Sequence, residues 1–411
     1  MYNYVYISFQ QRSFYMTKKQ HTAWVLTVLI SALYIFLGNK IAGRNYVMRD
    51  DLANGVAEKM KVVEIVDSNY EQTLFGDDAE MRGEEIILFE GQFVKGYKKG
   101  ETVLAIQRVD DMYAVDMRPV KAGDMILVYD NPDPEIDIDY MFAEFHRVTV
   151  LWVLMAIFAL LLLLFGRNKG VNTLVSLVFT LGAIFLVFIP AVLANGNIYL
   201  WAIITCIYII FMTLLIVSGW TRKSLAAIIG CLSGVTVSGV LVLFCDLFLH
   251  MTGLVNEDSM YLMMLNTEDP VDIKAIIFAA IILGAVGAIM DVAMSLSSSL
   301  AELKEQAPDM TGSGVVRSGF VIGRDIMGTM SNTLILAYIG SSLSTTLLLV
   351  AYNSNVMLLF NTEMIVVELL QAVAGSFGIL LTIPLTSIIC GVLYDDNGKK
   401  DKMTYKSEKH S

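Results

Sequence analysis

Residues 151–165 read LWVLMAIFALLLLLF, a run that contains no charged side chain. It lies in the first of seven long apolar stretches after residue 148, and a shorter apolar run at residues 24–37 precedes them all. A helix needs about 20 apolar residues to cross the hydrocarbon core of a bilayer, and a backbone in lipid must satisfy its own hydrogen bonds. The stretches therefore predict membrane-spanning helices that pack into a bundle.

The composition favours a membrane protein and argues against several other classes. Hydrophobic residues make up 55% of the chain, above the roughly 45–50% of an average soluble domain. The net charge is −11, the acids are concentrated between residues 50 and 145, and no basic block points to nucleic acid. All four cysteines lie in apolar stretches, where cysteine serves as a small apolar residue. The four histidines show no metal-ligand spacing, and the sequence predicts neither a metal nor another cofactor.

Eight spans are expected, and the short connections between them differ in charge. The spans cover residues 22–38, 149–166, 171–193, 198–219, 224–249, 273–295, 326–350 and 365–393. Lysine and arginine occupy every second connection, in five segments, whereas the opposite short connections carry none. Because basic residues stay on the cytoplasmic side, this pattern predicts that both termini are cytoplasmic.

The spans divide the chain into five parts. These are a cytoplasmic tail at residues 1–21, a retained signal-anchor helix at 22–38, an external β-rich domain at 39–148, a seven-helix bundle at 149–395 and a second cytoplasmic tail at 396–411. Strands are predicted where β-branched residues cluster between turn glycines, at residues 61–66, 85–90, 101–107 and 123–129. The expected fold is an α-helical membrane bundle of eight helices with one small mostly-β domain, a barrel or sandwich in which residues 93–103 resemble OB-like hairpins.

Asp291 is the leading candidate for a functional residue, because ionisable groups are costly in lipid. Helical spacing places it on one face with small or hydroxyl-bearing residues: Gly284, Gly287 or Ala288, Ser295 and Ser299. Such a face lets another helix approach closely, and its hydroxyls can share a proton or ion with the carboxylate. The alternative is that Asp291 lies near the cytoplasmic interface, where it reaches the headgroups or caps the helix.

Polar residues in two later spans complete the set of candidates. Around the start of the seventh span these are Arg324, Asp325 beside it, and Asn332; in the last span they are Glu368 and Gln371. Either Arg324 or Arg317 is also a candidate partner for the Asp291 carboxylate near the inner leaflet. The alternative for the seventh span is a basic anchor on the cytoplasmic side followed by a packing face of small residues.

Three other segments are interpreted as structural. Gly230, Gly234 and Ser238 recur at four-residue spacing and predict a ridge on which another helix packs. Residues 301–309 predict a short cytoplasmic helix and turn, and the acid-rich residues 130–139 predict a solvated linker back to the membrane.

Two motifs carry a resemblance to a known family. Residues 290–303, MDVAMSLSSSLAEL, and residues 323–340, GRDIMGTMSNTLILAYIG, resemble the YibE/F-like family of bacterial multi-pass membrane proteins. The resemblance implies the cell membrane and an external domain of the YibE type, and it implies no established activity. More distantly, an anchor helix, an external β domain and a bundle with an Asp-bearing helix resemble half of a SecD/SecF or RND-type exporter.

Two functions from different classes remain open. The first is a transporter, permease or ion-coupled export component that works with a paralogous membrane partner lacking the external domain. The second is a non-transporting envelope assembly or scaffold protein whose external β domain binds a partner. The sequence contains no hydrolase, zinc-protease or phosphate-binding signature, so the chain is not expected to be an enzyme.

Overall fold

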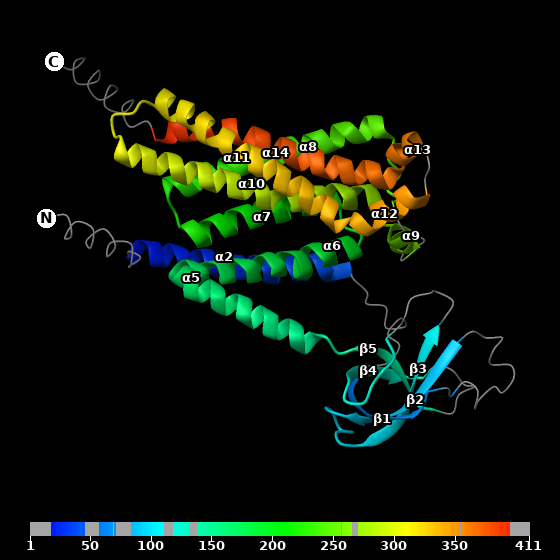
Figure 1. Ribbon diagram of the computed structural model, residues 1–411. Helices are drawn as coiled ribbons and strands as arrows, with labels where there is room; N and C mark the ends of the chain where they lie inside the picture. Colours follow the sequence, from blue (N-terminus) through cyan, green and yellow to red (C-terminus); the bar gives the residue numbers. More distant parts are fainter. Residues whose placement is uncertain are drawn as a thin grey trace, which may run out of the picture. The chain divides into compact units, whose positions relative to one another are not determined.

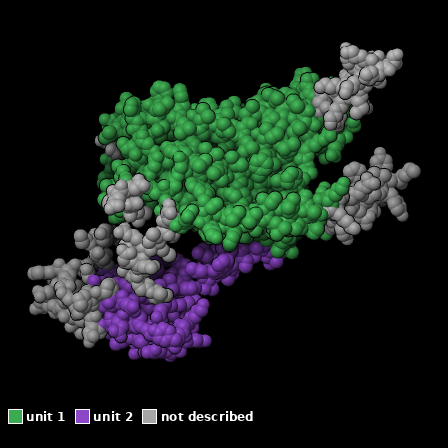
Figure 2. Space-filling model, turned by 180° about the vertical axis from the view of Figure 1, so that it is seen from behind, with its two compact units in different colours: residues 1–46, 162–411 green, residues 47–161 purple. Residues whose placement is uncertain are grey.

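The computed structural model describes residues 18–45, 57–68, 70, 84–110, 118–131, 138–255, 257–264, 270–352 and 355–394. The chain forms two compact units, residues 1–46 with 162–411 and residues 47–161, which Figure 2 shows in different colours. The predicted C-terminal tail, most of the predicted N-terminal tail and part of the predicted linker at residues 130–139 lie outside the described residues.

The larger unit is made of helices (Figure 1), and the first part of α5 belongs to the smaller unit. The helices are α2 (Lys18–Ala42), the short η1 (Gly43–Asn45), α5 (Val148–Gly182), the π-helical η5 (Ala183–Phe188), α6 (Ile189–Leu193), α7 (Ile198–Ser218), α8 (Arg222–Leu249), α9 (Glu257–Met264), α10 (Ile273–Gln306), α11 (Gly312–Ser341), α12 (Leu343–Tyr352), α13 (Val356–Asn361) and α14 (Glu363–Leu393). Among the described residues, six helical segments are long and apolar enough to cross a membrane, or seven if α11 and α12, which meet at 65°, form one bent span.

One of these segments, Val148–Leu193, contains two of the expected spans. Arg167 interrupts α5 with non-helical angles (φ 49°, ψ −125°). A Cβ placed on Gly170 would collide with the carbonyl oxygen of Leu162, which requires the chain to fold back between them. With α5 divided here and α11–α12 counted as one bent span, the helices match the eight spans expected. The fold class, a helical membrane bundle with a small β domain, is confirmed.

Helix α10 is longer than the sequence predicted. It continues to Gln306, so the short helix expected at residues 301–309 is present as the last part of α10 and not as an element of its own, and the expected turn follows it. The turn that follows is closed by Lys304, whose ammonium donates to the carbonyl oxygens of Pro308 (2.8 Å) and Met310 (2.5 Å). Thr311 then caps the next helix by accepting a hydrogen bond from the Gly314 amide.

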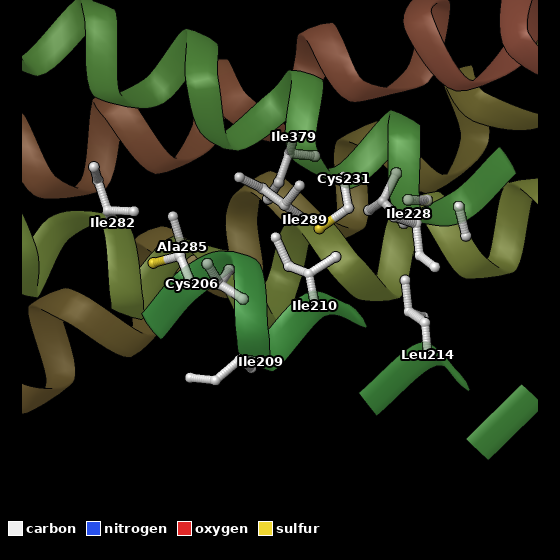
Figure 3. Packing of buried hydrophobic residues seen from close by; sticks show 14 of the residues in the cluster. Cys206, Ile209, Ile210, Leu214, Ile228, Cys231, Ile282, Ala285, Ile289 and Ile379 are labelled. Carbon is white, nitrogen blue, oxygen red and sulfur yellow. The ribbon is translucent and has the colours of Figure 1, made fainter. Parts of the chain in front are cut away.

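Helices α8, α10 and α14 pack against one another at the centre of the bundle. Cys206, Cys231 and Ile289 lie among its buried apolar side chains (Figure 3), as expected for cysteine used as a small apolar residue. The predicted ridge on α8 is confirmed: Cβ atoms on Gly230 and Gly234 would collide with the hydroxyls of two threonines on α14.

The smaller unit contains a closed β-barrel. Its strands are β1 (Glu58–Asp67), β2 (Glu84–Phe93), β3 (Thr102–Asp110), β4 (Met125–Asp130) and β5 (Tyr140–Phe145), in the order β1-β2-β3-β5-β4. The β3–β5 pair is parallel and the others are antiparallel, which is the strand order of an OB-like barrel. Four of the strands were expected, whereas β5 was not.

The hairpin between β2 and β3 is fastened to β5. Gly96 and Gly100 adopt positive φ angles of 93° and 90°, which favour glycine. The Lys98 ammonium donates a hydrogen bond to the Tyr140 hydroxyl, and this bond raises the pKa of Lys98 above its ordinary value. The ring of Phe93 packs edge-on against Tyr140, so the hairpin contributes to closing the barrel.

Candidate functional site

Asp291 lies close to the middle of α10. The helix has 34 residues, which corresponds to about 51 Å at 1.5 Å per residue. Asp291 is the only charged residue of the sequence between Lys274 and Glu302. Because α10 continues beyond residue 295, Asp291 lies farther from the end of its helix than from the end of the span that the sequence predicted.

The exposed face of α10 is made of small and polar residues. Its members follow helical spacing: Ala280, Gly284, Gly287, Asp291, Ser295 and Ser299. The opposite face is buried and apolar, with Ile281, Ile289 and Leu296 in the core of the bundle. A Cβ placed on Gly287 would meet no atom within 4 Å. No part of the described chain therefore covers α10 at this point, one turn from Asp291.

Helix α11 runs antiparallel beside this face. A Cβ on Gly284 would lie 2.7 Å from the Tyr338 hydroxyl oxygen, and a Cβ on Gly319 would lie 3.2 Å from a methyl carbon of Leu300. These two contacts fix the register of the pair. Counted along both helices at 1.5 Å per residue, Asp291 lies at a depth between those of Arg324 and Asn332.

The three candidates on α11 are exposed. Arg324, Asp325 and Asn332 lie away from the buried side of the helix, which Gly319 and Gly323 turn toward α14. Among the described residues, none of the hydrogen bonds or ion pairs joins Asp291 to Arg324. The carboxylate and the guanidinium thus lie at neighbouring depths on adjacent helices, without pairing inside this chain.

Glu368 and Gln371 form a second group near the start of α14. Both are half-buried. The Glu368 carboxylate interacts with Ser342 at the end of α11, and Gln371 lies beside Tyr338. The Tyr338 hydroxyl is buried and also contacts Gly284 of the exposed α10 face. Sequence reasoning missed Tyr338, and the only sequence signal for it was an aromatic hydroxyl in a helix of small and hydroxyl residues.

The structure therefore arranges the candidates along the α10–α11 pair and at the start of α14. Asp291, Arg324, Asp325 and Asn332 lie along α10 and α11, and Tyr338 links the α10 face to Glu368 and Gln371. Among the described residues, no group of three or more His, Cys, Asp or Glu is placed to hold a metal ion. The chemistry available to these side chains is proton exchange, ion pairing and hydrogen bonding.

Comparison with known proteins gives one match. The model of the family described as YibE/F-like protein matches residues 154–396, more than half of the chain. The matched region contains all six candidate residues and leaves out the β-barrel. No curated protein and no solved structure matches the chain significantly.

Proposed function

We propose that this chain, which belongs to the YibE/F-like family, is a transporter or ion-coupled export component of the cell membrane. The observation that carries the proposal is the position of Asp291: near the middle of α10, on an exposed face, with no partner for its charge among the described residues. A charge at such a depth is costly in lipid and marks proton or ion pathways in membrane proteins.

The polar groups along α10 and α11 supply the steps of a proton or cation path. From the inner end, Ser299 and Ser295 precede Asp291 on the exposed face, and Gly284 leads to the Tyr338 hydroxyl. Beyond Tyr338 the path reaches the Glu368 carboxylate. The route thus contains three hydroxyls and two carboxylates, and carboxylates inside a membrane mark proton relays.

A second membrane subunit, a paralogue without the β-barrel, closes the path on its open side. Gly287 on α10 and Gly328 on α11 both face open space, so a helix can approach the two backbones closely there. In this arrangement both termini are cytoplasmic and the barrel is extracytoplasmic, as the distribution of basic residues predicts.

Replacement of Asp291 by asparagine tests the proposal. Asp291→Asn keeps the size of the side chain but removes its charge and its exchangeable acid proton. Expressed in a strain that lacks the native gene, the variant should insert into the membrane normally but should not complement the deletion. Glu302→Gln is the matched control, because it also replaces a carboxylate by an amide on α10, at an exposed position near the end of the helix. Its function should equal that of the wild type.

Labelling with dicyclohexylcarbodiimide provides a direct measurement. This reagent modifies protonated carboxyl groups in apolar surroundings, and mass spectrometry locates the adduct. A proton-carrying Asp291 should be labelled in native membranes, and labelling should fall as the pH rises. Full function of Asp291→Asn, together with loss of function on deletion of the barrel, would instead establish the scaffold alternative.

A further inference from the structure

The β-barrel carries a cleft that the transport proposal does not use. Its volume is about 750 Å³, and it is lined by residues of β3, β4 and β5 and of the connection before β4. Three arginines line it, Arg108, Arg118 and Arg147, against two acids, Asp124 and Glu144. The cleft therefore carries a net positive charge in a chain whose overall charge is −11.

Two of the guanidinium groups lie over one aromatic ring. The Cζ atoms of Arg118 and Arg147 are 5.3 Å and 5.9 Å from the centroid of the Phe145 ring. Arg118 pairs with Asp124 at 3.4 Å, and Arg147 pairs with Glu144 at 2.8 Å. Both arginine side chains are about two-thirds exposed (64% and 67%). Exposed ion pairs of this kind contribute little net stability, so a ligand anion can share or replace the carboxylates.

A buried polar side chain holds the backbone of Arg118 in place. Gln107 is only 1% exposed. Its amide nitrogen donates to the Arg118 carbonyl oxygen (3.1 Å), and its amide oxygen accepts from the Val120 amide (2.8 Å). The edge of the cleft that carries the Arg118 guanidinium is thus fixed to strand β3 by two hydrogen bonds.

The rest of the lining is mainly apolar. Met141 and Phe142 contribute from β5, and the Phe142 ring packs edge-on against Phe145 at 5.1 Å. The cleft therefore combines exposed guanidinium groups with a hydrophobic wall. This combination suits an amphiphile that has an anionic head better than it suits a fully hydrated ion.

The cleft comes directly before an expected span in the chain, which favours a position at the membrane surface. Arg147 directly precedes α5, whose apolar residues 149–166 form an expected span. His146 and Phe145 also line the cleft. A side chain one residue before a spanning helix lies at the level of the lipid headgroups, where arginine and aromatic residues act as anchors.

We propose that this cleft binds the phosphate of an anionic phospholipid headgroup. The guanidinium groups of Arg118 and Arg147 hold the phosphate oxygens, an interaction for which the planar guanidinium fork is better suited than a lysine ammonium. The glycerol and the first carbons of the acyl chains pack on Met141 and Phe142. The bound lipid ties the barrel to the bilayer surface at the start of α5.

Lipid retention by the purified full-length protein tests the site. The protein is exchanged into detergent with added phosphatidylglycerol, and retained lipid is counted by native mass spectrometry. The double variant Arg118→Gln/Arg147→Gln should retain the lipid about tenfold less, a loss that corresponds to about 1.4 kcal/mol. The double variant Lys95→Gln/Lys99→Gln removes the same charge from exposed positions on the β2–β3 hairpin and should retain lipid like the wild type.

Two further measurements make the outcome decisive. Arg118→Lys/Arg147→Lys should restore part of the retention, which rules out misfolding as the cause of the loss. Millimolar inorganic phosphate should leave retention unchanged, whereas displacement of the lipid by free phosphate would show that the ligand is the soluble anion. The proposal is overturned if Arg118→Gln/Arg147→Gln and Lys95→Gln/Lys99→Gln retain the same amount of lipid.

Discussion

Glycines on α8 and α14 set the distance between these two helices. A Cβ on Gly234 would collide with the Thr382 hydroxyl and lie 3.1 Å from the Gly378 carbonyl oxygen. The Ser238 hydroxyl donates to the Ala374 carbonyl oxygen at 2.9 Å, so the two helices are also joined by a hydrogen bond. Since the Gly378 oxygen belongs to the backbone, the contact at Gly234 cannot be relieved by rotating a side chain.

Gly234→Ala should destabilise the bundle by about 1–3 kcal/mol, the usual cost of overpacking a tight interior. In a thermal unfolding experiment on the purified protein in detergent, the midpoint should fall by several degrees. Gly328→Ala is the matched control, because Gly328 is also helical but has no atom within 4 Å of the added Cβ. The prediction is contradicted if the two variants unfold at the same temperature.

Among the elements, those with a strong local pattern could be predicted from the sequence. The spans follow uninterrupted apolar runs, and β1 to β4 follow β-branched runs between glycines. Strand β5 has no such pattern: it is six residues long, follows an acid-rich stretch and pairs with the distant β3. The end of α10 was missed because the serines at residues 295–299 lower the hydropathy without breaking the helix.

The candidate site was only partly predictable for a related reason. Helical spacing correctly grouped Asp291 with Gly284, Gly287 and Ser299, because spacing depends on one helix alone. How two helices are rotated and shifted against each other depends on all the residues between them. The contact of Tyr338 with Gly284, and the absence of an Asp291–Arg324 pair within this chain, are of this second kind.

Strand β5 gives a test at the scale of one element. It pairs with both β3 and β4, and Tyr140 contributes to the barrel core, so the barrel should not close without it. A fragment of residues 57–147 should fold and give a β-type circular dichroism spectrum with a cooperative thermal transition. A fragment of residues 57–138 should show neither. A cooperative transition in the shorter fragment would mean that the other four strands are sufficient.

For the whole molecule, the basic segments and the helix ends give one consistent picture of the larger unit. The start of α2, the break at Arg167, the α7–α8 and α10–α11 connections and the end of α14 lie at one end of the helices, on the left in Figure 1. Helices α9 and α13 lie at the opposite end. The basic connections therefore share one end of the bundle, and the sequence predicts that this end is the cytoplasmic one.

This assignment leads to a prediction about both units of the chain. In intact cells, an impermeant thiol reagent should reach only the cysteines on the outer side of the membrane. With the four native cysteines replaced by alanine, Lys95→Cys on the barrel should be labelled and Asn168→Cys beside the α5 break should not. Both positions are exposed in the folded protein, so unequal labelling reports the side of the membrane and not burial.

Permeabilised cells provide the control, because both cysteines should then react. Labelling of Asn168→Cys alone in intact cells would reverse the orientation, and the barrel with its arginine cleft would face the cytoplasmic leaflet.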